Sequence, residues 1–171
     1  MATITAQHEI VHSDTPKASF GAWASLGLFT LLPLAAFSGA NFAADAIGTM
    51  PLFFSPAGLP GWAGAAIHLV MLASIGLALG LTYAKGAHGR KILPWGVALV
   101  LAMVIFPYFA PQLDSFALAL VMTSVLLIGM ATSIRVARVS SAAGWVMLPS
   151  LLWLGFGAAL GLAVAAAWSP P

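Results

Sequence analysis

The sequence predicts an all-α membrane protein, a bundle of five transmembrane helices, and three observations support this class. Of the 171 residues, 61% are hydrophobic and only 6% are charged. Five apolar runs are each close to the ~20 residues that a membrane-spanning helix needs. All 6 basic residues fall in segments that five spans place on one side of the membrane. The composition and the charge pattern therefore agree on the fold.

The apolar runs have the pattern of helices and not of membrane β-strands. A membrane barrel requires polar and apolar residues to alternate, and a stretch such as 117–128 shows no alternation. Helices satisfy their backbone hydrogen bonds within each segment. The five predicted spans cover residues 20–40, 61–83, 93–110, 115–134 and 143–168.

A polar segment, residues 1–19, precedes the first span. It lacks the basic start and short apolar core of a cleavable signal, so we expect the first span to be retained. The segment itself is expected either to be a disordered terminus or to be held by a partner. The chain thus divides into a tail, 1–19, and a bundle, 20–168.

The basic residues predict the orientation of the bundle. The side opposite to them carries Asp45 and Asp114 and no Lys or Arg. By the positive-inside rule, the N-terminus is expected in the cytoplasm, with the chain in a bacterial inner (cytoplasmic or intracytoplasmic) membrane. The net charge of +2 comes from a few basic residues on the cytoplasmic side, and we expect no nucleic-acid partner. The basic residues are Lys17, Lys85, Arg90, Lys91, Arg135 and Arg138.

The connection at 41–60 is the longest inside the bundle and is too apolar for a free loop. Phe53 and Phe54 would be unfavourable in water, so the loop is expected to fold over the bundle or to dip into the membrane interface. The first alternative makes it a lid over a ligand, and the second makes it an anchor with no ligand beneath it.

Two residues inside the spans are candidates for a site. Trp153 lies well inside the fifth span, whereas the other five tryptophans lie at span ends, where indole rings favour the headgroup region. His68 is ionisable and lies deep in the second span, with Gly64 on the same face. His68 either ligates the Mg or Fe of a tetrapyrrole or remains neutral and hydrogen bonds to a neighbouring helix.

Several sequence features are similar to those of the translocator protein family, also called tryptophan-rich sensory proteins or TspO/MBR. The stretch Leu148-Pro149-Ser150-Leu151-Leu152-Trp153 resembles the family's Pro-Tyr-Leu-x-Trp, and Pro60-Gly61-Trp62 resembles its Pro-x-Trp. Residues Phe106-Pro107-Tyr108-Phe109 resemble its Trp-Ser/Thr-Pro-x-Phe-Phe, and Pro51, Phe53, Phe54 and Pro56 lie where the family has its lid. The resemblance covers about residues 20–168.

The resemblance implies a pocket beneath the first loop, where family members bind porphyrins and sterols. It also implies changes in that pocket: Ser150 replaces a tyrosine, Ala102 an asparagine, and Ile105 and His68 tryptophans. Such a pocket would be drier than the family's. The residues expected to bind the ligand are Phe53, Phe54, Trp62, His68, Tyr108 and Trp153.

Three functions follow as expectations. The first is binding of a hydrophobic ligand, a tetrapyrrole, carotenoid or lipid, with a sensory or regulatory role. The second is an accessory subunit of a larger photosynthetic or respiratory membrane complex, or a homodimer, with a structural role. The third is a transporter or a porphyrin-modifying enzyme. The chain shows no carboxylate pair, phosphate loop or metal-ligand cluster, so we expect that it is not an enzyme.

Overall fold

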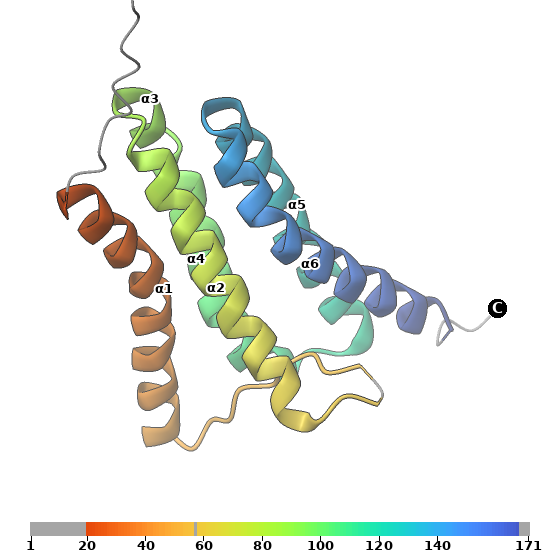
Figure 1. The fold of residues 1–171 in the computed structure, drawn as a ribbon. Coiled ribbons are helices and arrows are strands. Elements are labelled where there is room, and N and C mark those ends of the chain that lie inside the picture. The colour runs from red at the N-terminus through yellow and green to blue at the C-terminus, as the bar shows by residue number, and fades with distance from the viewer. Residues whose placement is uncertain (1–19, 57, 168–171) are drawn as a thin grey trace, which may run out of the picture.

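The computed structural model describes residues 20–56 and 58–167, and these residues form helices and connecting loops without a strand (Figure 1). Five of the helices are long and apolar enough to cross a membrane. The predicted all-α fold with five spans is therefore confirmed, and the chain is an integral membrane protein. The helices are α1 (Phe20–Ala46), α2 (Gly61–Tyr83), α3 (Ala87–Arg90), α4 (Leu93–Phe109), η1 (Ala110–Gln112), α5 (Ser115–Val139) and α6 (Ser141–Ala167).

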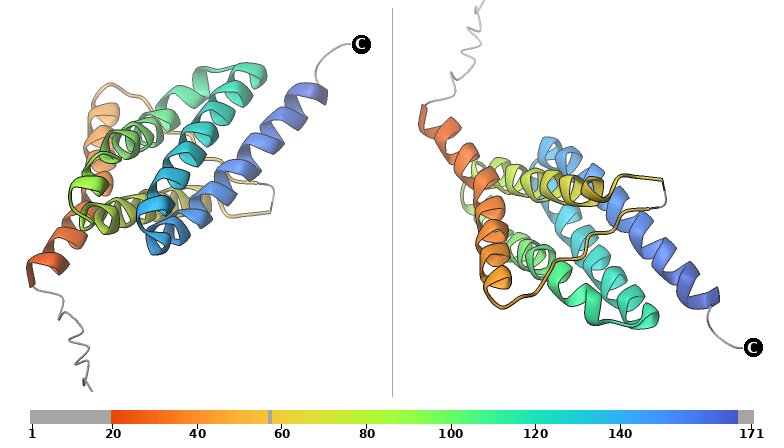
Figure 2. Two further views of the ribbon diagram at one scale, coloured as in Figure 1. Left: turned by 90° about the horizontal axis from the view of Figure 1, so that it is seen from above. Right: turned by 90° about the horizontal axis from the view of Figure 1, so that it is seen from below.

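The long helices form a ring in the order α1, α2, α6, α5, α4, which is closed by contacts between α4 and α1 (Figure 2). Helix α2 contacts each of the other four and is the most enclosed span. Half of the most apolar window of α2 is buried, against 11% for the corresponding window of α1. Helix α1 therefore exposes most of its surface, and α2 positions the residues of the interior.

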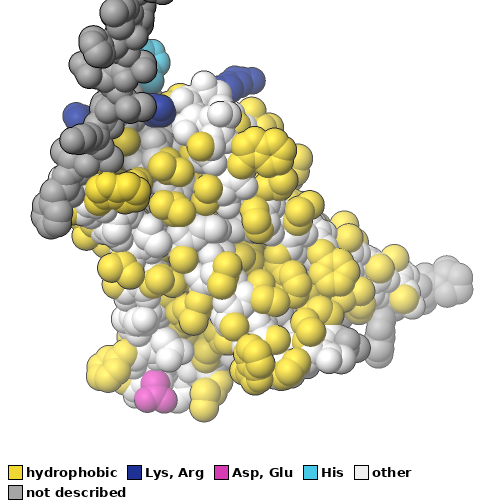
Figure 3. Space-filling model, viewed as in Figure 1, with side chains coloured by type: hydrophobic (Ala, Val, Ile, Leu, Met, Phe, Trp, Pro, Cys, Tyr) yellow, Lys and Arg dark blue, Asp and Glu magenta, His cyan; other side chains and the backbone are white. Residues whose placement is uncertain are grey.

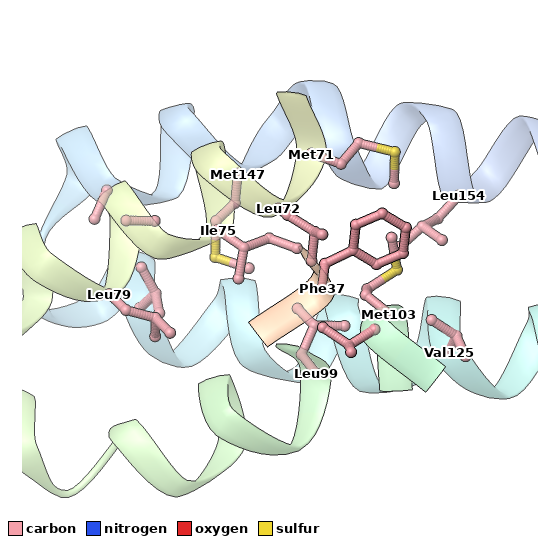
Figure 4. Packing of buried hydrophobic residues seen from close by; sticks show 14 of the residues in the cluster. Phe37, Met71, Leu72, Ile75, Leu79, Leu99, Met103, Val125, Met147 and Leu154 are labelled. Atoms are coloured by element: carbon pink, nitrogen blue, oxygen red, sulfur yellow. The ribbon is translucent and has the colours of Figure 1, made fainter. Parts of the chain in front are cut away.

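Side chains from all five long helices meet in one core between the middle parts of the helices. Leu72, Ile75, Leu99 and Met147 are almost completely buried there. Figure 4 shows the Phe37 ring of α1 entering this cluster beside Leu72 and Met103. In a membrane, apolar side chains gain little by moving from lipid into the protein interior. The ring of helices is therefore held together mainly by close packing of this core.

The two ends of the bundle differ in charge (Figure 3). The basic end carries the short helix α3 and the α5–α6 junction, where Arg135 lies 4.0 Å from the centre of the Trp95 ring. The acidic end carries Asp45 and Asp114, and Asp114 caps α5 by accepting a 2.7 Å hydrogen bond from the Ala117 N–H. The ends match the sides predicted from the charges.

Two helices are longer than the sequence predicted. Helix α1 continues through residues 41–46, so the long loop begins at residue 47 and not at 41. The added residues contain neither Pro nor Gly and are rich in Ala, which favours helix. Helix α5 continues through Arg135 to Val139 because charged residues remain helical outside the hydrocarbon layer. The tail, 1–19, and Trp168 lie outside the described residues.

Candidate functional site

The loop between α1 and α2 is attached to α4 through a carbonyl that a proline leaves free. The Leu52 N–H donates a 2.8 Å hydrogen bond to the Pro107 carbonyl. In a continuing α-helix this carbonyl would accept from residue 111, but residue 111 is proline and has no N–H. Pro51, Pro56 and Pro60 keep the loop itself from becoming helical. The loop is thereby fixed across the acidic end of the bundle.

Two adjacent phenylalanines of this loop point into the bundle. The Phe53 ring lies 5.9 Å from that of Phe37 and 5.4 Å from that of His68, measured between ring centres. The Phe54 ring lies 5.5 Å from Trp153 and 5.7 Å from Phe156. The loop therefore folds over the bundle, and its side chains fill the space beneath its own backbone.

Glycines on two helices make room for Phe54. A Cβ atom at Gly64 in α2 would lie 2.6 Å from the Phe54 carbonyl oxygen. A Cβ atom at Gly157 in α6 would lie 3.7 Å from the Phe54 ring and 2.6 Å from the Met122 side chain. Any larger residue at position 64 would displace the loop, so this glycine allows the loop to approach the helix.

A cavity of about 280 Å³ lies beside the loop at the acidic end. Its walls are apolar apart from the hydroxyls of Ser55 and Ser115. Leu160 and Val164 of α6 line it and are 39% and 42% exposed, so the cavity opens sideways within the span of α6. The lining residues are Leu52, Phe53, Phe54, Ser55, Phe106, Ala110, Ser115, Leu118, Met122, Gly157, Leu160, Gly161 and Val164.

A smaller chamber of about 30 Å³ lies on the inner side of the same phenylalanines. His68 and the indole of Trp153 are the side chains around it that carry polar atoms, and the others are apolar. The chamber and the larger cavity share five lining residues, so they are neighbours separated by side chains. The shared residues are Leu52, Phe53, Phe54, Phe106 and Met122.

His68 is 8% exposed and packs against the Phe37 and Phe53 rings, which also contact each other. The backbone of Met103 in α4 approaches the imidazole. Pro107 removes the N–H that would otherwise bind the Met103 carbonyl, which leaves that carbonyl able to accept from another helix. The Nε2 atom of His68 is buried and has no hydrogen-bond partner.

The structure brings four of the six predicted ligand-binding residues together: Phe53, Phe54, His68 and Trp153 line the small chamber. Tyr108 lines neither cavity. Its ring lies 6.1 Å from Phe37, and its hydroxyl donates a 3.4 Å hydrogen bond to Asn41 Oδ1. Trp62 also lines neither cavity and is 71% exposed on the outside of α2, at the helix start, where indole rings favour the headgroup region.

Several lining residues were not predicted from the sequence. Phe106 and Met122 separate the two cavities, and Leu118 and Leu160 extend the larger one along α5 and α6. These residues have no chemistry that distinguishes them from the other apolar residues of their spans. The one available signal was Gly157, which forms a Gly-x-x-x-Gly pair with Gly161 and lines the cavity beside it.

The residues around His68 do not fit a tetrapyrrole. A chamber of about 30 Å³ has room for about one or two water molecules and not for a macrocycle beside Nε2. No Lys or Arg lines either cavity, so the carboxylates of a porphyrin would find no partner there. Among the described residues, no group of three His, Cys, Asp or Glu side chains could hold a metal ion.

The fold and the cavity define a five-span membrane protein with an apolar interior site beneath its first loop. The model of the TspO/MBR family matches residues 28–167, and the chain belongs to the TspO/MBR family. No curated protein matches the chain.

Ser150 lies where the sequence resemblance implies a tyrosine in the family motif. Ser150 is 2% exposed, and its hydroxyl lies 2.6 Å from that of Ser74 in α2. Ser150 lines neither cavity. The small side chain at this position joins α6 to α2 and does not reach either cavity.

Proposed function

We propose that this protein binds a hydrophobic ligand in the 280 Å³ cavity beneath its first loop and has a sensory or regulatory role. The cavity carries the proposal because its walls are apolar, it lies between the ends of apolar spans and the loop forms part of its boundary. Of the ligands considered, a tetrapyrrole, a carotenoid or a lipid, a lipid suits it best. The volume of about 280 Å³ is just below the ~300–1,000 Å³ typical of ligand pockets, and the open side would let a longer chain extend into the bilayer.

The loop supplies a physical basis for a sensory role. Residues Leu52 to Ser55 line the cavity, and the Leu52 N–H bonds to the Pro107 carbonyl at its edge. A ligand that displaces Phe54 would move the loop at the surface of the acidic end, where another protein could detect it. We propose binding without catalysis, because no acidic, basic or thiol side chain lines the larger cavity.

Substitution of Phe53 tests the proposal. Phe53→Ser removes a ring worth roughly 1.5–3 kcal/mol when buried, so the loop should become accessible to protease and retained lipid should be lost. Native mass spectrometry of the full-length protein from membranes would measure the lipid. Phe42→Ser is the matched control, since Phe42 is 80% exposed on α1 at the same end. Unchanged lipid retention and loop protection in Phe53→Ser would refute the proposal.

The proposed orientation places the N-terminus and the basic end in the cytoplasm of a bacterium and the loop on the opposite side of the inner membrane. The one-sided distribution of basic residues supports this placement. Reporter fusions to the C-terminus should be active outside the cytoplasm. A fusion active only in the cytoplasm would reverse the orientation and place the loop on the cytoplasmic side.

A second candidate function, an accessory subunit of a larger membrane complex, is favoured by α1. This helix has the least buried of the five spans, and Trp23, Leu28, Leu31 and Phe42 are all exposed on it. A partner helix on this surface would let the bundle serve as a structural subunit. Blue-native electrophoresis of native membranes distinguishes the two functions: a complex that dissociates when Leu28 and Leu31 are replaced by Ala would support the second.

A further inference from the structure

His68 differs from the other buried polar residues of the bundle. Among the described residues, its Nε2 is the one buried side-chain nitrogen or oxygen atom without a hydrogen-bond partner. Thr82 and Thr132 donate to the carbonyls of Ala78 and Ile128 one turn earlier, and Ser150 pairs with Ser74. Buried polar atoms are nearly always satisfied, so an exception inside a cavity calls for a ligand or a water molecule.

The surroundings of Nε2 restrict what can bind there. The chamber has room for about one or two water molecules, or for a single hydroxyl group. The adjacent Phe37 and Phe53 rings, 5.2 and 5.4 Å from the imidazole centre, cover one side of the imidazole. No Lys, Arg, Asp or Glu lines the chamber or the larger cavity. The group that binds Nε2 is therefore small and uncharged.

The chemistry of imidazole favours a hydroxyl group. A neutral histidine has one donor and one acceptor nitrogen. The Met103 carbonyl can only accept, so the nitrogen that bonds to it is the donor Nδ1, and Nε2 is left as the acceptor. A hydroxyl can donate to Nε2, whereas a ketone or an ester cannot. An alcohol therefore matches this site.

The position of the chamber indicates where the rest of the ligand lies. Phe53, Phe54, Phe106 and Met122 separate the chamber from the larger cavity, whose walls are apolar and whose open side includes Leu160. For a thin, flexible chain to reach from one cavity to the other, only side chains such as Phe54 would have to turn. A rigid ring system would require the loop and the helices to move apart.

The geometry points to His68 as the polar anchor of a site for a single-chain neutral lipid alcohol, such as a fatty or isoprenoid alcohol. The hydroxyl binds Nε2 in the small chamber, the first part of the chain occupies the larger cavity, and the remainder extends into the bilayer. This assignment rests on the proposed function, because it requires that the larger cavity hold a hydrophobic ligand.

Photolabelling of the full-length protein in nanodiscs tests the assignment. The probes are a long-chain primary alcohol that carries a diazirine in its chain and the matching alkane with the same diazirine but no hydroxyl. One hydrogen bond should make labelling by the alcohol about 3- to 10-fold stronger than labelling by the alkane at equal concentration. The labels should map to the loop at 50–56 and to α6.

Variants assign the difference to the imidazole. His68→Leu should reduce labelling by the alcohol to the level of the alkane and leave labelling by the alkane unchanged. His68→Gln, which keeps a donor and an acceptor, should retain part of the preference. His88→Leu is the control, because His88 is an exposed histidine at the basic end. Thermal unfolding in the same nanodiscs would confirm that each variant is folded.

Each remaining outcome is decisive. Equal labelling of the wild-type cavity by the alcohol and the alkane would overturn the assignment and leave water as the partner of Nε2. Equal loss of both labels in His68→Leu would overturn it as well, because the histidine would then support the cavity and not the hydroxyl. Absence of either label from the loop and α6 would instead refute the proposed ligand-binding function.

Discussion

The two halves of α2 carry similar residues but pack against different neighbours. In the half nearer the basic end, Gly76 packs against the backbone of α1 at Phe29 and Thr30, and Ser74 pairs with Ser150 of α6. In the half nearer the acidic end, Gly64 packs against the loop at Phe54, and His68 keeps one nitrogen without a partner. Glycine and polar residues of α2 thus contact other helices in one half and the loop in the other.

The largest expected effect is that of Gly76→Ala. A Cβ atom at this position would overlap the Phe29 carbonyl oxygen, and neither helix can shift without separating α1 from α2. We expect a loss of stability of about 3 kcal/mol, measured by denaturant unfolding in micelles. Gly39→Ala, where nothing lies within 4 Å, should not destabilise the protein. Equal stability of the two variants would show that the α1–α2 contact is not tight.

Gly64→Ala applies the same change to the other half of α2 and should cost less. The Cβ atom would lie 2.6 Å from the Phe54 carbonyl oxygen, but the loop can move outward. We expect a loss of about 1–2 kcal/mol together with faster proteolysis of residues 50–60. Gly61→Ala, which has open space around it, is the control. A loss as large as that of Gly76→Ala would mean that the loop is as fixed as a helix.

Pro111→Ala sharpens the comparison because it changes the residue that leaves the Pro107 carbonyl free to bind the loop. The new N–H would compete with Leu52 for the Pro107 carbonyl, so the loop should lose a hydrogen bond worth about 1 kcal/mol. Hydrogen exchange at the Leu52 amide should become roughly five times faster, as that energy implies. Pro94→Ala, at the other end of α4, is the control and should leave exchange at the Leu52 amide unchanged. Unchanged exchange at Leu52 in Pro111→Ala would contradict the role assigned to Pro111.

The smallest expected effect is that of Ser150→Ala. It removes the hydrogen bond to Ser74, and such bonds between membrane helices contribute about 0.6 kcal/mol on average. Unfolding in micelles should show this loss of stability. Loop proteolysis should not change, because Ser150 contacts the half of α2 that packs against helices and not the half that packs against the loop. Ser124→Ala is the control, since the Ser124 hydroxyl bonds only within α5. A change in loop proteolysis would show that the two halves of α2 are coupled.

The candidate site was predictable where a residue was unusual for its position. Phe53 and Phe54 were conspicuous in a loop, and His68 and Trp153 were conspicuous inside spans, and all four line the small chamber. Trp62 was predicted from its place in a family motif, but it faces outward. Phe106, Met122 and Leu160 were missed because an apolar residue in an apolar span carries no sign of whether it faces lipid or a cavity.

The sequence by itself determined the number of spans, their helical form and the separation of basic and acidic ends. These properties depend on local hydrophobicity and charge, which can be read along the chain. Only the tertiary structure decided that Leu52 binds the carbonyl freed by Pro111, that Gly64 receives the loop, and that Nε2 of His68 faces a chamber without a partner. Those contacts depend on which helices become neighbours in the ring, and neighbours that are distant in sequence leave no local pattern.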